Sequence, residues 1–282
     1  MSKGLNEFLE IFFIGILMGS ADILPGISGG TIALITGIYE RLINGISNIH
    51  FSFIKYLLKR NFKEFKIKMA EEIDFELFIP LILGIGLAFF FLSNIITYLI
   101  YIYPAYIYSF FLGLIFASTY ILYKKLKEIN IKIIGLTIIS AILTYFFIGL
   151  NPINANHSLI TIFFSGLIAV CAMILPGISG SMILVLLGQY NYILNSLSSL
   201  NIVEIIVFMF GAIIGILGFS NILRYLIKHY ENIIMALLIG VMLGTLRKPI
   251  IIITNSINNS IFYGVLFTII GILLIFILEK KH

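Results

Sequence analysis

Two short segments combine residue types that interrupt a helix and leave backbone N–H groups unpaired. In the first, residues 22–31, Pro25 lacks an N–H and clashes with a continuing helix, and Gly26 tolerates backbone conformations that other residues avoid. Ser28 is a favourable N-cap residue, so a new helix is predicted to begin beside it. The first N–H groups of that helix have no partner within the helix and point outward from its end.

The chemistry that such a helix end supports is anion binding. Gly29 and Gly30 carry no side chain, so an anion can approach the backbone closely, and Ser28 and Thr31 add hydroxyls. A helix N-terminus joins a partial positive charge to free N–H donors, and this combination binds phosphate or carboxylate groups. We therefore predict that Ser28, Gly29, Gly30 and Thr31 bind a phosphate.

The same arrangement occurs again 151 residues later. The seven residues from Ile23 to Gly29 recur without change as Ile174 to Gly180. One Pro-Gly pair in a membrane helix is usually a kink, whereas two identical breaks at equivalent positions favour a binding site. The predicted helix break and phosphate ligands of this second copy are Pro176, Gly177, Ser179, Gly180 and Ser181.

Three charged residues near the first break are candidates for coupling or gating. Asp22 lies beside the break, and its counterpart in the second copy is Met173. An acid at membrane depth is costly and is typically functional. Asp22 therefore either carries a coupling proton, or it caps a backbone donor or orients Ser28. An ionised Asp22 would repel a phosphate and is not counted as a ligand. Glu40 and Arg41 lie about 18 Å beyond Ser28 along a helix, where Arg41 either reaches lipid phosphates at the interface or takes part in gating.

The composition sets the environment in which these residues act. The chain has 282 residues, 60% of them hydrophobic and 11% charged, with a mean hydropathy of +1.12. Soluble domains are about a quarter charged, so the chain is predicted to be an all-α integral membrane protein. The single cysteine, Cys171, excludes an intramolecular disulfide, and no Cys/His cluster has metal spacing. The net charge of +5 arises from loop residues and does not indicate a nucleic-acid partner.

The elements that must position the two breaks are apolar segments. Six of ten are long enough for a membrane span of about 20 residues. The other four form two pairs, each joined by a break, and each pair either crosses the membrane twice or re-enters as a hairpin of short helices. The predicted segments are 8–24, 28–46, 77–102, 105–123, 132–150, 158–175, 178–197, 203–227, 232–248 and 260–278.

The chain is a duplication. Beyond the breaks, the offset of 151 also pairs Gly37 with Gly188, and an offset of 127 pairs Gly84 with Gly211. The change in offset is explained by a longer charged loop at about 47–76. The predicted units are 1–150 and 151–282, each with a Pro-Gly-interrupted helix pair and three transmembrane helices, forming one functional unit.

The duplication predicts inverted repeats. Each half contains an odd number of crossings under either interpretation of the interrupted pair, so the second half must enter the membrane from the opposite side. With cytoplasmic N- and C-termini, 16 of the 18 Lys and Arg residues fall on the cytoplasmic side, and only Arg247 and Lys248 fall outside. This distribution indicates a multi-pass protein of the cytoplasmic membrane, in which the two breaks face each other near the midplane.

The loop at 47–76 interleaves basic residues with phenylalanines such as Phe51, Phe53, Phe62 and Phe65. One interpretation is a solvated cytoplasmic loop. The other is an amphipathic segment that lies on anionic lipid, which a mixture of basic and aromatic residues favours.

At the two breaks the sequence resembles the PopT-type polyprenyl-phosphate translocases. Met18 to Asp22 followed by Pro25 to Thr31 looks like the first signature of that family, with the continuation Gly37 to Arg41, and Ile174 to Tyr190 looks like the second. The resemblance covers essentially the whole chain. It implies recycling of undecaprenyl phosphate, or a related polyprenyl phosphate, from the outer to the inner face of the cytoplasmic membrane.

The functional prediction is therefore a lipid-phosphate transporter that works by alternating access. Paired helix N-termini would replace the water around a phosphate headgroup, which cannot cross hydrocarbon unpaired. The alternative is a transporter of a small soluble anion, coupled to H⁺ or Na⁺, that uses the same site. An enzyme such as a lipid phosphatase is not expected, because no segment clusters His, Asp and Arg and His157 has no evident partner. No cofactor is predicted.

Overall fold

The computed structural model describes residues 2–23, 28–153, 155–256 and 261–279. Within these ranges every regular element is helical. The break predicted at Pro25 and Gly26 lies outside the described residues. Five helical stretches are long and apolar enough to cross a membrane, and two shorter apolar helices accompany them. The five are Gly4–Asp22, Phe75–Ile102, Pro104–Lys125, Ile131–Ile148 and Ile202–Ser256, and the shorter two are Leu159–Ile174 and Ile261–Ile277.

The first half of the chain begins with a full-length helix and a pair of short ones. The 21-residue α1 is long enough to span, although its segment was one of the doubtful ones. Three further spans then follow a short helical hairpin. The helices are α1 (Ser2–Asp22), α2 (Gly29–Ile35), α3 (Tyr39–Ser47), α4 (Ser52–Leu58), α5 (Phe62–Glu72), α6 (Phe75–Leu87), a π-helical turn (Ala88–Leu92), α7 (Ser93–Ile102), α8 (Pro104–Lys125) and α9 (Ile131–Ile148).

The second half has the same order without the hairpin. The segments predicted at 203–227 and 232–248 form one assigned helix, α13, which bends sharply at Tyr230, where the backbone is not helical (φ −136°, ψ 37°). The helices are α10 (Leu159–Ile174), α11 (Gly180–Leu186), α12 (Tyr190–Ser198), α13 (Ile202–Thr245), α14 (Arg247–Ser256) and α15 (Ile261–Glu279).

Helix bounds repeat at the offsets found in the sequence. The short helices α2 and α3 begin and end 151 residues before α11 and α12. The turn between each short pair uses a glycine in the left-handed region, Gly37 at φ 75° and Gly188 at φ 66°. The non-helical Tyr230 lies 127 residues after Tyr103, which joins α7 to α8 with φ −127° and ψ 51°.

Within each half, the first helix packs closely on a later helix through glycines: α1 on α6, and α10 on the first part of α13. A side chain at Gly15 of α1 or Gly84 of α6 would collide with the backbone of the other helix. The equivalent residues Gly166 of α10 and Gly211 of α13 make the same kind of approach. Small residues at such positions let helix backbones come close in a membrane.

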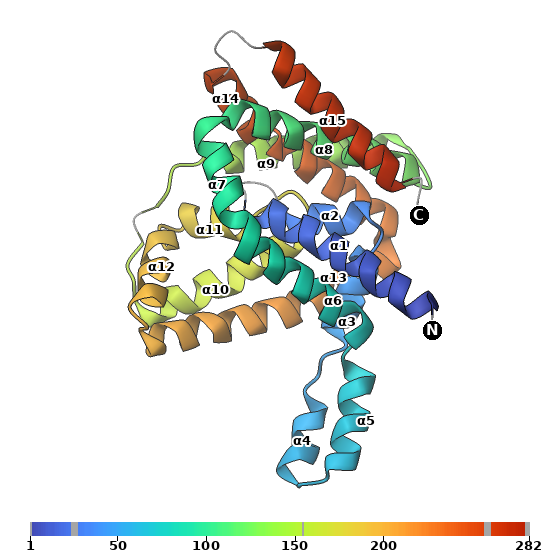
Figure 1. The fold of residues 1–282 in the computed structure, drawn as a ribbon, viewed down its shortest axis with the longest axis vertical. Coiled ribbons are helices and arrows are strands. Elements are labelled where there is room, and N and C mark those ends of the chain that lie inside the picture. Colours follow the sequence, from blue (N-terminus) through green and yellow to red (C-terminus); the bar gives the residue numbers. More distant parts are fainter. Residues whose placement is uncertain (1, 24–27, 154, 257–260, 280–282) are drawn as a thin grey trace.

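The later helices pack across the halves instead. Gly113 of α8 lies against the backbone of Thr268 in α15, so this pair joins the first half to the second. Gly240, in the second part of α13, lies against the backbone of Thr137 in α9. In this second contact the last helix of the first half packs on the second half. Each half therefore packs its last long helix on the other half, and the two halves are interleaved (Figure 1).

The segment 47–76 is largely helical, not an extended loop. Its helices α4 and α5 form a hairpin that projects from the bundle, and their axes run crosswise to α10 and the first part of α13 (Figure 1). Phe53 of α4 and Phe65 of α5 meet edge to face with their ring centroids 5.9 Å apart. The hairpin is thus held together by its own aromatic contact, outside the main core.

The main core lies between the interrupted helices of the first half and the later helices of both halves. Fully buried side chains include Ala33 of α2, Ile115 of α8 and Met242 of α13. Because this core encloses α2 and α3, the backbone beside the first break is shielded by protein, as non-helical backbone at membrane depth requires.

Candidate functional site

The N-terminus of α2 begins as the sequence predicts. Ser28 is the N-cap residue, has an extended backbone, and accepts a hydrogen bond from the Gly30 N–H at 3.1 Å. Its carbonyl accepts from the Thr31 N–H at 3.0 Å. Ser28 and Thr31 are both buried. The prediction that Ser28 caps a new helix is therefore confirmed.

Asp22 supplies an internal anion to this helix end. The Gly29 N–H donates to Asp22 Oδ1 at 2.6 Å, across the break between α1 and α2. A Cβ on Gly29 would lie 2.6 Å from Asp22 Oδ2, so only a glycine admits the carboxylate. Of the two roles predicted for Asp22, the structure displays the capping of a backbone donor. In this conformation the first N–H groups of α2 are already paired.

The N-terminus of α11 differs, because Met173 replaces the carboxylate. Ser179 stands at the N-cap with an extended backbone, but its hydroxyl bonds to the Ser181 hydroxyl at 2.6 Å and caps no N–H. Among the described residues, no hydrogen bond uses the N–H of Gly180 or Ser181. The second copy thus keeps the unpaired donors that the first copy satisfies internally.

The two breaks are in direct contact. The Gly177 N–H donates to Thr31 Oγ1 at 2.8 Å, so a residue of one break caps the backbone of the other. A Cβ on Gly30 would lie 2.9 Å from the carbonyl oxygen of Ile174, so this glycine permits the close approach. Ser28 Oγ lies 3.4 Å from the carbonyl oxygen of Leu175.

Tyr39 is a member of this contact that the sequence did not single out. Its side chain is only 1% exposed, and its hydroxyl donates to the Ile174 carbonyl at 3.2 Å. The signal available was the pairing of Tyr39 with Tyr190 in the repeat, but nothing in that pairing indicates a bond between the halves.

An apolar groove reaches the first break. It has a volume of about 460 Å³ and lies between α1, α3 and α6 on one side and α10 and α13 on the other. Asp22 and Gly30 are at its wall, while the rest of the lining is apolar. Representative lining residues are Met18, Ile46, Phe78, Ile85, Met173 and Ile216. The groove therefore joins an apolar surface to a charged helix end, as an amphiphilic ligand requires.

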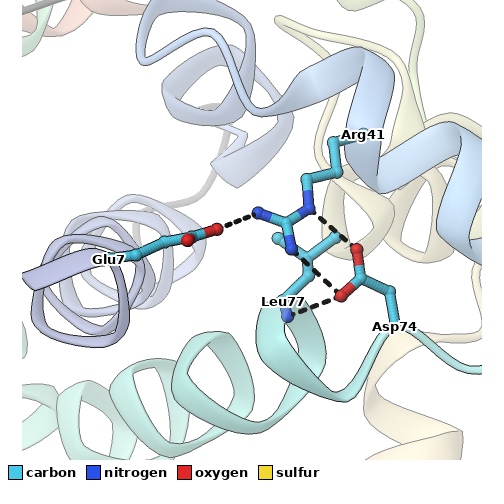
Figure 2. Close-up of polar contacts among 4 residues, drawn as sticks. All are labelled: Glu7, Arg41, Asp74 and Leu77. Atoms are coloured by element: carbon cyan, nitrogen blue, oxygen red, sulfur yellow. Dashed lines mark hydrogen bonds and ion pairs between the residues drawn. The ribbon is translucent and has the colours of Figure 1, made fainter. Parts of the chain in front are cut away.

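Arg41 lies in an ion-pair cluster at one end of the bundle. Its guanidinium bonds to both carboxylate oxygens of Asp74, at 2.7 and 3.0 Å, and to Glu7 at 2.7 Å (Figure 2). Asp74 also caps α6 by accepting from the Leu77 N–H at 3.0 Å. The Arg41 hydrogen bonds hold the pKa of the Asp74 carboxyl below its usual range. The cluster ties α3 to α1 and to the start of α6.

Glu40 faces a separate polar cavity of about 700 Å³. Arg224 shares this cavity, and its partners among the described residues are neutral acceptors, the side-chain oxygens of Asn48 at 2.6 Å and Asn221 at 3.2 Å. Glu40 also lines a second cavity together with Arg41 and Asp74, so it lies between the polar cavity and the ion-pair cluster.

His157 has partners, contrary to the expectation that it has none. Its ring stacks on Tyr192 with centroids 4.0 Å apart, and Nδ1 lies 3.0 Å from the Gln189 side-chain oxygen. Gln189 is fully buried and donates to the Asn156 carbonyl at 3.1 Å. These contacts fix Asn156 and His157 on the α11–α12 turn, and among the described residues no His-Asp-Arg constellation results.

The fold and this site define a multi-pass α-helical membrane protein with broken helices at its centre. A model of the family described as undecaprenyl phosphate translocase-like matches residues 18–276. The polyprenyl-phosphate transporter of Vibrio cholerae serotype O1 is 36% identical over 242 residues, which cover 86% of this chain and 77% of the relative. The polyprenyl-phosphate transporter of Staphylococcus aureus is 32% identical over 253 residues, which cover 82% of each chain. No solved structure matches significantly. The chain belongs to the undecaprenyl phosphate translocase-like family.

Proposed function

We propose that the chain moves a polyprenyl phosphate, such as undecaprenyl phosphate, across the cytoplasmic membrane. The observation that carries the proposal is the meeting of the two breaks, where Thr31 of one caps Gly177 of the other beside an apolar groove. A lipid phosphate has one charged end and one long apolar tail, and the groove together with the helix ends matches both. The membership of the chain in its family supports the same substrate class.

The phosphate is held, in this proposal, by one helix end at a time. The unpaired N–H groups of Gly180 and Ser181, with the hydroxyls of Ser179 and Ser181, receive it in the conformation described here. In the alternate conformation the phosphate takes the place of the Asp22 carboxylate at Gly29 and Gly30, assisted by Ser28 and Thr31. The apolar groove that reaches this second position would hold the isoprenoid tail.

Asp22 is then the residue that couples transport to an ion. While ionised, it occupies the donors of α2 and competes with the phosphate. Binding of a proton, or of Na⁺, would remove that competition and free the helix end. Met173 stands at the equivalent place in the second repeat and cannot bind a proton. The ion is therefore coupled only to the step in which the phosphate binds at α2.

The architecture proposed is a pair of inverted repeats, 1–150 and 151–282, with their interrupted helix pairs re-entering at the centre. Support comes from the matching bounds of the short helices and from opposite helix directions, since α1 and α10 run in opposing senses in Figure 1. The start of α1 and the end of α15 lie toward the same side of the bundle, which fits two cytoplasmic termini (Figure 1).

The test is transport by purified protein in liposomes that carry a fluorescent polyprenyl phosphate. We expect wild type to move the lipid between leaflets, and the Gly29→Leu/Gly180→Leu variant to lose this activity, because both helix ends are blocked. The matched control is Gly218→Leu, at a position with open space around it. The control should keep wild-type activity.

Two results would count against this function. Equal transport by wild type and the double variant would remove the breaks from the mechanism. Uptake of a water-soluble phosphate, with no movement of the lipid, would favour the small-anion transporter instead.

A further inference from the structure

The α4–α5 hairpin carries an exposed surface that combines apolar and basic residues. At its tip, Leu58 and Phe62 are 80% and 62% exposed, although both are large and apolar. Lys59, Arg60 and Lys63 lie between or beside them in the chain, and none of them takes part in an ion pair with another described residue. We name these five residues the hairpin tip.

Hydrogen bonds at the base of the hairpin hold its two chain segments together. The Glu72 carboxylate accepts from the His50 and Ser52 N–H groups, at 3.0 and 3.1 Å, and from the Ser52 hydroxyl. Hydrogen bonds from Ser52, His50 and Phe51 outweigh the effect of burial and lower the pKa of Glu72, so it remains ionised and keeps these bonds at neutral pH. The chain segments that enter α4 and leave α5 are thereby joined to each other.

The hairpin leaves the bundle at the level where a membrane span begins. Only Ile73 and Asp74 separate α5 from the span that starts at Phe75. The axes of α4 and α5 run crosswise to α10 and the first part of α13 (Figure 1). A hairpin that starts at a membrane boundary and runs crosswise to these helices extends along the membrane surface, not away from it.

We infer that the hairpin tip binds anionic lipid at the membrane surface. Its apolar side chains would enter the headgroup region, and its three cations would neutralise lipid phosphates nearby. The charge balance supports this partner, since Lys55 and Lys66 add two further cations while Glu64 is the one acid between residues 52 and 68. This inference is independent of transport and names a surface that lies outside the proposed substrate site.

The absence of tryptophan from the chain gives a direct test. Phe62→Trp in the full-length protein introduces a single fluorophore at the hairpin tip, and brominated lipids quench tryptophan that enters the acyl region. The protein is reconstituted in vesicles of phosphatidylcholine, with or without phosphatidylglycerol. We expect a blue-shifted emission and quenching at least about two-fold stronger in the anionic vesicles.

Two variants separate charge from position. Lys59→Gln/Arg60→Gln/Lys63→Gln in the Phe62→Trp background should abolish the gain in anionic vesicles, whereas Lys124→Gln/Lys125→Gln, elsewhere on the chain, should leave it. Phe90→Trp serves as the reference for a tryptophan in the acyl region. Phe90 is 76% exposed in the middle of a span, so a tryptophan there should be quenched in both lipid compositions.

Equal emission and quenching at position 62 in neutral and anionic vesicles would overturn the inference. So would a blue-shifted emission that is already present in detergent and rises with protein concentration, because the tip would then bind a second copy of the chain. Since the tip is exposed, the variants should elute as wild type does in size-exclusion chromatography, and they leave lipid transport unchanged.

Discussion

Asp22 directly precedes the seven residues that are identical in the two breaks, and Met173 takes its place in the second copy. The Asp22 carboxylate occupies the first N–H of α2, while α11, with Met173 in the equivalent place, leaves its donors unpaired. A charge-assisted bond of this kind is stronger than one between neutral groups. The N-termini of α2 and α11 therefore differ in whether their first N–H groups are paired, although the shared motif predicts that they are equivalent.

Substitution of Asp22 separates its role as a cap from its charge. Asp22→Asn keeps an oxygen that accepts from Gly29, so we expect stability within about 1 kcal/mol of wild type but a transport rate that no longer responds to an imposed pH gradient. Asp22→Ala leaves the Gly29 N–H unpaired and should cost about 1–3 kcal/mol. Thermal unfolding and liposome transport measure the two effects. A stable Asp22→Ala variant would refute the capping role.

Asp74 should make stability depend on pH in the acidic range. Because Arg41 lowers the Asp74 pKa in the folded state, the pair stabilises the fold above the usual carboxyl pKa of 3.8 and loses that effect as the pH falls through the lowered value. Both side chains are about a third exposed, so the contribution is about 1 kcal/mol. Asp74→Asn, which keeps the cap on Leu77, should be less stable than wild type at pH 7, with the difference vanishing in acid. Parallel melting curves would expose a pH-independent difference, which contradicts the ion-pair origin.

At the scale of elements, the close packing of the helices in each half depends on glycines at positions where any side chain would collide with the neighbouring helix. Gly84 of α6 meets the backbone of Phe12 in α1, while Gly86, two residues further along, faces open space. Both lie in the same helix, so they differ in packing and not in helix propensity.

This difference gives a matched pair of variants. Gly84→Ala should destabilise the protein by about 1–3 kcal/mol, because α1 and α6 must separate. Gly86→Ala should be neutral or stabilise by up to about 1 kcal/mol, because alanine favours a helix. Thermal unfolding in detergent compares them. Similar effects from the two substitutions would show that α1 and α6 do not pack as described.

Much at this scale was accessible from the sequence, and some was not. The Ser28 cap and the equivalence of the two halves followed from Pro, Gly and Ser placement and from the two offsets, whereas the division of the predicted segments 28–46 and 178–197 into two short helices each did not. The Asp22–Gly29 and Thr31–Gly177 bonds did not, because they depend on how the chain returns across the break and on contacts between halves. The hairpin helices were also missed, because basic and aromatic residues in a loop carry no clear helical period.

At the scale of the whole molecule, the two halves are interleaved. The last helix of each half packs on the other half, as in the contact of α8 with α15 and of α9 with α13, whereas α8 and α9 share no extended contact among the described residues. The sequence alone does not indicate which helices pair, because these contacts join segments that are far apart in the chain. A motion of one half must therefore carry a helix of the other.

Cross-linking tests this pairing in a Cys171→Ala background. Cysteine pairs at Ser109 and Thr268, or at Thr137 and Ala236, replace residues that hydrogen-bond across the halves at 3.1 and 3.2 Å. A short bis-maleimide should link each of these pairs, and should not link Ser109→Cys with Thr137→Cys. Mass spectrometry of the digested protein reads the result. A link between positions 109 and 137, without the other two, would mean that each half packs on itself.

The central claim is that a lipid phosphate binds where the two broken helices meet, and an experimental structure with bound polyprenyl phosphate tests it most directly. We expect the phosphate oxygens within about 2.7–3.2 Å of the Gly180 and Ser181 N–H groups, or of Gly29 and Gly30 with Asp22 displaced. A phosphate bound away from both breaks, for example beside Arg224 in the polar cavity with the breaks unchanged, would contradict the account.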